Sequence, residues 1–191
     1  VRSSAASDVY KRQVEQRVNT VDDGRGGQVE QIVKAPVWFE PAGDGKTPMT
    51  KCFERAAQVL SNFLLAHPSC YPPLVINLSD GEATDGDPEA SARQLRELAS
   101  EDGAVLLFNA HISSRPEQSI EFPDQETGLP DEHARRLFRM SSRMPPAMQN
   151  SARQAGLTVT PESRGFVFNA DLASVVRFLD IGTRVDLKNL R

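Results

Sequence analysis

The sequence lacks the features that mark membrane-spanning, secreted and nucleic-acid-binding proteins. No apolar run approaches the roughly 20 residues that a bilayer-spanning helix requires, and 191 residues contain only two cysteines, too few for a disulfide framework. The first residues lack the basic start and apolar stretch of a secretion signal, so we expect none. The formal charge of -4 provides no general attraction to nucleic acid or to anionic membranes. These absences favour a cytoplasmic protein with reduced thiols that binds neither nucleic acid nor membrane.

The length and the composition favour one globular domain. The chain is 39% hydrophobic and 25% charged, which is ordinary for a folded protein. We expect residues 14–185 to form the domain and residues 186–191 to be a C-terminal tail. The segment "VRSSAASDVYKRQ", Val1–Gln13, has no apolar period and resembles translated adapter DNA. We therefore expect residues 1–13 to be a non-native tail and the domain to be truncated at its N-terminus.

Short apolar strands alternate with amphipathic helices along the chain. Residues 14–21 and 28–40 are typical of a hairpin or of two edge strands. Buried strands are predicted at residues 74–78, 104–112 and 165–170. Helices are predicted at residues 48–67, 87–100, 131–142, 146–155 and 171–182, and we expect Gly103 and Gly182 to end the second and the last of them. This alternation predicts an α/β fold with a doubly wound, mainly parallel sheet and helices on both faces, in which ligands bind at the carboxyl ends of the strands.

The triplet Gly45-Lys46-Thr47 at the start of the first helix resembles the end of a phosphate-binding loop. That loop follows the pattern G-x-x-x-x-G-K-[ST], but its first glycine would fall on Glu40. Pro41 and Pro48 also lack the backbone N–H groups with which such a loop holds phosphate. We therefore exclude a nucleotide site here, which leaves Thr47 as a helix cap whose hydroxyl oxygen can serve a second purpose.

An acidic loop, "LSDGEATDGDPE", begins where the strand at residues 74–78 ends. Its later carboxylates, on Glu82, Asp85, Asp87 and Glu89, are predicted to lie in a solvated turn, with Asp87 as the cap of the next helix. Asp80 comes first after the strand, so we expect it at the same edge of the sheet as Thr47. A hydroxyl and a carboxylate form part of an octahedral oxygen shell for Mg²⁺, which readily keeps water ligands.

These two elements resemble the von Willebrand factor A (VWA) family. "GKTPMTKCFERA" is similar to its G-x-T-P-[LM] element before a helix, and "VINLSDGEATDGDP" is similar to its apolar strand that ends in [ST]-D-G. The resemblance covers roughly residues 29–182. It implies a Rossmann-like sheet with a metal-ion-dependent adhesion site, in which Thr47 and Asp80 are the metal ligands. The family's D-x-S-x-S motif, which follows its first strand, does not occur in this sequence, so we expect that strand to be missing and the metal to be held weakly.

The resemblance also implies a function. VWA domains bind proteins without covalent chemistry, through Mg²⁺ (or Mn²⁺ or Ca²⁺) whose shell is completed by an acidic residue of the partner. The positive end of the helix dipole at Pro48 favours such an incoming acid. The chain resembles stand-alone bacterial, cytosolic VWA proteins, including those associated with tellurite resistance, some of which work with kinases and phosphatases. The resemblance therefore implies a scaffold or regulatory module whose partner is a kinase or phosphatase of the same system.

Two other classes of function remain open at this point. A Mg²⁺-dependent hydrolase or phosphotransferase would use Asp80, Glu82 and His111, which follows a buried strand and should reach the same edge. The alternative for His111 is a structural role, in which its side chain forms a hydrogen bond to the loop backbone. His133 is expected to face solvent. A metal-free interaction domain would use Trp38 and Phe39 as an exposed contact patch.

Overall fold

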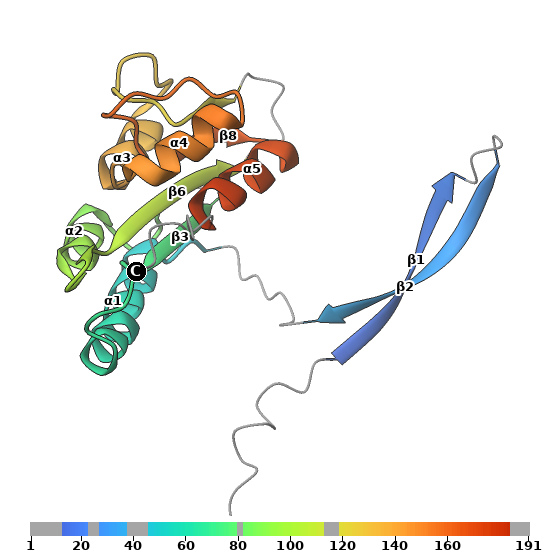
Figure 1. Ribbon diagram of the computed structural model, residues 1–191, viewed down its shortest axis with the longest axis horizontal. Coiled ribbons are helices and arrows are strands. Elements are labelled where there is room, and N and C mark those ends of the chain that lie inside the picture. The colour runs from blue at the N-terminus through green and yellow to red at the C-terminus, as the bar shows by residue number, and fades with distance from the viewer. Residues whose placement is uncertain (1–12, 23–26, 38–45, 80–81, 113–118, 184–191) are drawn as a thin grey trace, which may run out of the picture. The chain divides into compact units, whose positions relative to one another are not determined.

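The computed structural model describes residues 13–22, 27–37, 46–79, 82–112 and 119–183. The chain divides into two compact units, Val1–Gly45 and Lys46–Arg191. The described part of the first unit is an antiparallel hairpin of β1 (Gln13–Asp22) and β2 (Gln28–Val37), as Figure 1 shows. The hairpin predicted from the strand pattern is thereby confirmed.

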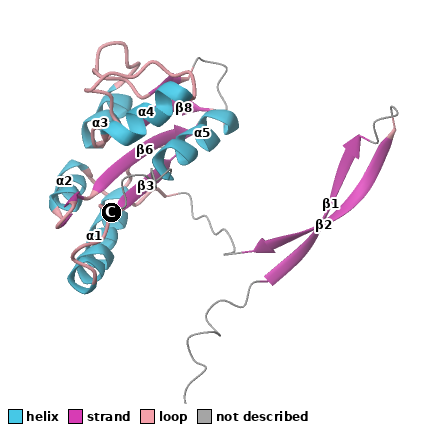
Figure 2. Cartoon of the chain, viewed as in Figure 1, coloured by secondary structure: helices cyan, strands magenta, loops and turns pink. Residues whose placement is uncertain are grey.

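The second unit is a mixed α/β unit built on a mainly parallel sheet (Figure 2). The sheet has the order β3-β6-β8-β7, in which β7 alone is antiparallel to its neighbour. Its strands are β3 (Leu74–Ser79), β6 (Leu106–Ile112), β7 (Ile120–Glu121) and β8 (Phe166–Ala170). The helices are α1 (Met49–Ala66), α2 (Glu89–Glu97), α3 (Glu132–Met140), α4 (Pro146–Gln154) and α5 (Leu172–Thr183). The mainly parallel α/β sheet predicted from the alternating pattern is confirmed.

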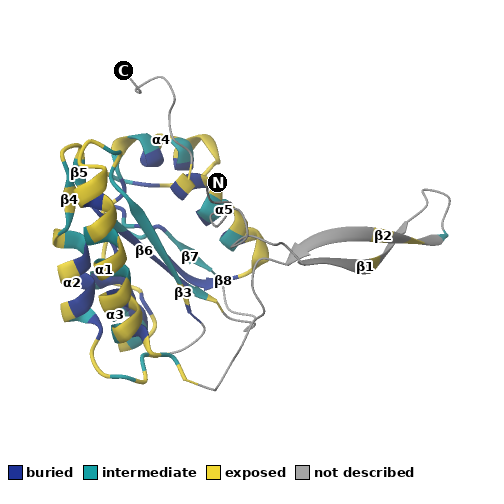
Figure 3. Cartoon of the chain, turned by 90° about the horizontal axis from the view of Figure 1, so that it is seen from below, coloured by how far each residue is buried: buried dark blue, intermediate teal, exposed yellow. Residues whose placement is uncertain are grey.

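Side chains of the central strands alternate between two cores, because successive residues of a strand point to opposite faces. Leu107 of β6 packs with α1, α2 and α3 in one cluster, whereas its neighbour Phe108 packs with α4 and α5 in the other. Phe166 and Val167 of β8 divide in the same way. Figure 3 shows these two groups of helices on either side of the sheet.

Aspartate caps fix the starts of α3 and α5 where the sequence predicts them. The side chain of Asp131 accepts a hydrogen bond from the Ala134 N–H at 2.7 Å, and that of Asp171 accepts one from the Ser174 N–H at 2.7 Å. Gly156 has a φ of 83° directly after α4, a left-handed conformation that glycine adopts without strain.

Three local expectations are wrong. The helix α2 ends at Glu97 and not at Gly103, because Leu98 takes an extended conformation and leads into a two-residue antiparallel pair, β4 (Ala99–Ser100) and β5 (Gly103–Ala104). Gly182 lies inside α5, where an added Cβ would come within 3.2 Å of Leu74. Proline and glycine in residues 114–130 predict a loop, but the two-residue strand β7 lies within this range and is too short to show a period.

Candidate functional site

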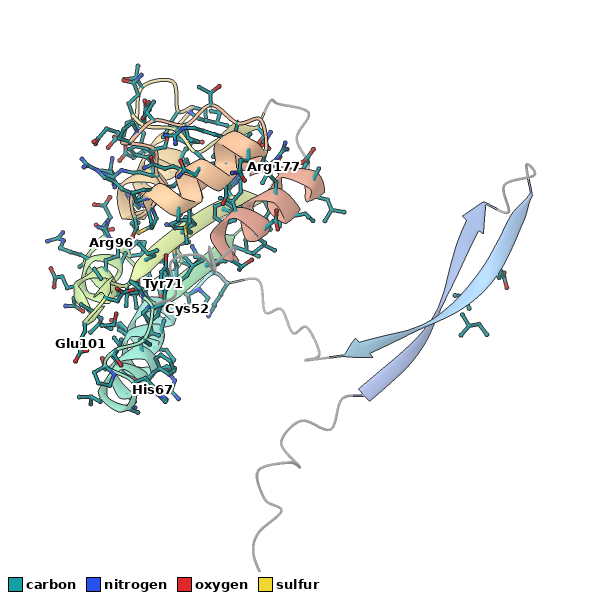
Figure 4. The ribbon with its side chains drawn as sticks, viewed as in Figure 1. Cys52, His67, Tyr71, Arg96, Glu101 and Arg177 are labelled. Carbon is teal, nitrogen blue, oxygen red and sulfur yellow. The ribbon has the colours of Figure 1, made fainter. Side chains whose placement is uncertain are left out.

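A groove lies at the carboxyl end of β3, beside the start of α1. Its volume is about 450 Å³. It is lined by Lys46, Thr47, Pro48, Met49, Cys52, Asn77, Leu78, Ser79 and Ile112. Leu78 and Ile112 are 45% and 37% exposed, so the groove has an apolar wall beside its polar end. Figure 4 shows that Cys52 and His67 lie at opposite ends of α1, and the groove is at the Cys52 end.

Hydrogen bonds join Thr47 to the acidic loop. The Thr47 N–H donates to the Thr84 hydroxyl at 3.0 Å, and the Thr84 N–H donates to the Thr47 carbonyl at 2.9 Å. Both backbone polar groups of Thr47 are thus held by one residue that follows 37 positions later in the chain. The half-buried Thr47 side chain makes no hydrogen bond to any other described residue. The expectation that Thr47 caps this helix is therefore wrong, since the N-cap of α1 is Pro48 and no side-chain bond caps it from that position.

Asp85 caps the N-terminus of α1 with both of its carboxylate oxygens. The N–H groups of Thr50 and Lys51 donate to them at 3.1 and 2.9 Å. Partial burial disfavours the charged carboxylate, but these bonds outweigh it and lower the pKa of Asp85 below its ordinary value. The expectation that Asp85 lies in an idle, solvated turn is therefore wrong. Asp87 lies one residue before Pro88, the N-cap of α2, so the predicted cap is displaced by one residue, although its carboxylate accepts a hydrogen bond from the Glu89 N–H at 3.0 Å.

Asp80, the second predicted metal ligand, lies outside the described residues. Its neighbour Ser79 is 7% exposed and lines the groove together with Thr47, and Glu82 on the other side is exposed. Within the part of the chain that the structure describes, no group of three or more His, Cys, Asp or Glu side chains could hold a metal ion. The metal site predicted from Thr47 and Asp80 therefore stays a prediction.

A buried chain of amides and hydroxyls lies beside the groove. The Asn77 side-chain amide donates to the Asn109 side-chain carbonyl at 2.9 Å, and the Asn109 amide donates to the Ser141 hydroxyl at 2.9 Å. Asn109 is fully buried. The chain connects β3 through β6 to the end of α3. This chain of hydrogen bonds was not predicted. The signal for it in the sequence is an asparagine within each of two apolar strands, "LVINL" and "LLFNA", because a polar amide is uncommon in a buried strand.

His111 and His133 meet at the carboxyl end of β6. The His111 Nδ1 accepts a hydrogen bond from the Asn169 N–H at 3.3 Å, and its ring stacks on Phe168 at 4.5 Å. His111 therefore reaches the sheet edge and bonds backbone, as predicted. Asn169 has a φ of 53°, a conformation that is uncommon for residues other than glycine.

The expectation that His133 faces solvent is wrong. Its ring lies 5.6 Å from that of His111, edge to face, and its Nε2 is buried with no hydrogen-bond partner among the described residues. Burial lowers the pKa of His133, although the charges of Glu82 and Asp131 oppose the shift. Periodicity misassigned His133 because α3, only nine residues long, does not show from its sequence which side packs on the sheet.

The remaining predictions concern two aromatic residues, the two cysteines and the absence of a membrane span. Trp38 and Phe39 lie outside the described residues, so the contact patch proposed for them is not tested. Cys52 and Cys70 are free thiols, as expected. No helix in the described part of the chain is both long and apolar enough to cross a membrane.

Comparison of the chain with protein-family models, with curated proteins and with solved structures gives no match. The resemblance to VWA domains therefore stays an expectation, and the function below is proposed from the site.

Proposed function

We propose that the protein is a divalent-cation-dependent protein-binding module of the VWA type. In this proposal the sheet belongs to a doubly wound, Rossmann-like domain, and Thr47 and Asp80 hold Mg²⁺ (or Mn²⁺ or Ca²⁺) at the carboxyl end of β3. The bound cation supplies a positive charge to which an acidic side chain of the partner can bind.

One observation carries the proposal: Thr47 and Ser79 line the same groove. Asp80 follows Ser79 directly, and consecutive Cα atoms are about 3.8 Å apart. Thr47 and the described residue that precedes Asp80 therefore line one groove, which supports a site shared by the two proposed ligands. The Thr47–Thr84 hydrogen bonds support the same arrangement from the other side of Asp80.

The donor set fits a hard cation. A threonine hydroxyl and an aspartate carboxylate are oxygen ligands of the kind that Mg²⁺ prefers, and water can complete an octahedral shell. Because the sequence contains no D-x-S-x-S motif, this chain supplies fewer protein ligands than the VWA resemblance implies. We therefore propose weak cation binding that a partner carboxylate strengthens.

The electrostatic role first assigned to α1 requires a correction. The sequence suggests that the positive end of the helix attracts the partner's acidic group, but Asp85 already occupies this end through the Thr50 and Lys51 N–H groups. An internal carboxylate at this position offsets the helix dipole and reduces its repulsion of a cation. The attraction for an acidic partner is then supplied by the cation.

The partner in this proposal is a cytoplasmic protein with an exposed acidic residue, such as a kinase or phosphatase of the same system. The test is a pull-down with the tagged chain in Mg²⁺ and in EDTA, with Asp80→Ala as the variant and Asp87→Ala as a control in the same loop. We expect capture of a partner in Mg²⁺ that is lost in EDTA and in Asp80→Ala but kept in Asp87→Ala. Undiminished capture by Asp80→Ala would contradict the proposal.

A Mg²⁺-dependent hydrolase or phosphotransferase is the second candidate. The observation that favours it is the His111–His133 contact, which places two imidazoles at the same sheet edge as Ser79, the register partner of His111. Phosphatase and nuclease assays with Mg²⁺ or Mn²⁺ distinguish the candidates. Turnover that Asp80→Asn abolishes would favour the enzyme over the binding module.

A further inference from the structure

The strands β6 and β8 lose their common register next to His111. Ala110 pairs with Val167, but the next paired residue of β6, Ile112, lies opposite Ala170. Two steps along β6 thus correspond to three steps along β8, and His111 faces an extra residue of β8. This is the arrangement of a β-bulge, in which the extra residue lacks its regular partner in the ladder of hydrogen bonds.

The His111 side chain supplies a hydrogen-bond acceptor at this bulge. Its Nδ1 accepts from the Asn169 N–H at 3.3 Å, where a regular ladder uses a backbone carbonyl. The ring stacks on Phe168, with 4.5 Å between centroids and 8° between planes, and this contact fixes its position. Asn169 has a left-handed φ of 53° and is 4% exposed, so solvent has little access to it. An imidazole therefore takes the place of a backbone acceptor inside the folded sheet.

This hydrogen bond requires one particular form of the imidazole. Neutral histidine has one nitrogen that accepts and one that donates, whereas protonated histidine has two that donate. The Nδ1 of His111 can accept from Asn169 only when the ring is neutral and carries its proton on Nε2. A proton on Nδ1 would set two N–H groups against each other, so the bond at the bulge would be lost. Histidine is also the side chain whose ordinary pKa lies in the physiological range.

The surroundings of His111 make its charge state sensitive to a second histidine. His133 of α3 lies edge to face with the His111 ring, with 5.6 Å between centroids. Burial lowers the pKa of His133, and a proton on either ring opposes a proton on the other, because like charges repel. On the β3 side, the register partner of His111 is Ser79, which carries no charge. The charged groups that act on His133 come from the acidic loop and from α3: Glu82, Asp131 and Arg136.

From this geometry we propose that His111 is a pH-sensitive latch at the β8 bulge, which the neutral ring closes and a proton on the ring opens. The segment that the latch holds leads from Asn169 to Asp171, whose carboxylate caps α5 through the Ser174 N–H. Opening of the latch therefore loosens the junction between β8 and α5 at the carboxyl edge of the sheet. The latch needs no cation, so this inference is independent of the proposed function.

Ring ¹⁵N spectra and amide spectra of the full chain between roughly pH 8 and pH 5, the range in which histidine titrates, test the latch. At the higher pH we expect His111 to carry its proton on Nε2. As the pH falls, the Asn169 amide signal should shift together with the His111 ring signals. The protection factor of that amide should fall about fivefold, which corresponds to one ordinary hydrogen bond. A proton on Nδ1 at the higher pH, or an Asn169 amide that does not follow the ring, would overturn the proposal.

The decisive variant is His111→Asn, because an asparagine side-chain oxygen can take the place of Nδ1 and accept a hydrogen bond at every pH. We expect this variant to lose the pH-dependent shift at Asn169, whereas the control His133→Gln should keep it. A shift that persists in His111→Asn, or that disappears only in His133→Gln, would assign it to another group and overturn the latch. Amide signals of β3 report whether each variant is folded. If His111→Asn does not fold, the wild-type tautomer and the Asn169 titration decide the outcome alone.

Discussion

The strands β3 and β6 have almost the same kind of sequence and very different surroundings. "LVINL" and "LLFNA" are both apolar runs with a single asparagine, and both predict a strand that is covered on its two faces. Leu107 and Phe108 of β6 are fully buried, whereas β3 is half-buried and its Leu78 is 45% exposed. The cause is the order of the sheet, in which β6 lies between two strands and β3 pairs with β6 at the end of the order.

The difference between the two strands separates the part of the sheet that stabilises the fold from the part that carries exposed polar groups. The centre of the sheet holds the two cores, and the β3 end carries the groove, Thr47 and the acidic loop. We therefore expect mutations at the centre to act mainly on folding, and mutations at the β3 end to act mainly on binding.

The largest loss of stability is predicted for a substitution at the centre of the sheet. Phe108→Ala removes a fully buried ring that contacts Phe178 at 5.8 Å between centroids, and we expect a loss of about 3–5 kcal/mol in the free energy of unfolding. Leu78→Ala at the edge should cost about 1 kcal/mol, because much of that side chain is already exposed. Urea unfolding of both variants measures the difference, and similar losses would contradict the contrast between centre and edge.

A smaller effect is predicted for the two asparagines. Asn109→Ala removes the hydrogen bonds that join Asn77 to Ser141, although the Ser141 hydroxyl still donates to the Leu137 carbonyl, and we expect a loss of about 1–3 kcal/mol. Asn77→Ala should cost less, because Asn77 lies at the groove, where water can replace the lost partner. Thermal unfolding of the two variants checks the order, and a costlier Asn77→Ala would reverse our interpretation of the network.

The smallest predicted effect concerns pH. Burial holds the pKa of His133 below its ordinary value, so the folded protein favours the neutral imidazole. The unfolded chain takes up the proton near pH 6.5, and the contribution of His133 is therefore present above that pH and is lost as the pH falls below it. His111, Glu82, Asp131 and Arg136 are the groups that face it.

We expect His133→Gln to lose less stability than the wild type between pH 7.5 and about 5.5. Urea unfolding at the two pH values measures this change, and the control is His67→Gln, which alters the exposed histidine at the C-cap of α1. Identical pH dependence in wild type and His133→Gln would show that the His133 environment does not discriminate between its charge states.

Much of the fold could be predicted because its signals are local. Caps at Asp131 and Asp171 depend on the few residues beside them, and the apolar runs of β3, β6 and β8 are continuous. The exposure of β3 could not be predicted, because strand order is a property of the sheet and both apolar runs show the same pattern.

The site could be predicted only in part for the same reason. Thr47 and the end of β3 share a rim, as the parallel sheet requires. The role of Asp85 was missed because its hydrogen bonds go to Thr50 and Lys51, and no local pattern shows such a long-range cap. His133 was misassigned because two turns of helix do not reveal which side packs on the sheet.

The most direct test of the central claim is a Mg²⁺ titration of the metal-free chain, followed by the amide signals of residues 46–52 and 77–85 in NMR spectra. We predict saturable shifts in both segments for the wild type, and their loss in both segments when either Thr47→Val or Asp80→Asn is introduced. Shifts confined to one segment, or shifts that persist in both variants, would contradict a cation shared by Thr47 and Asp80.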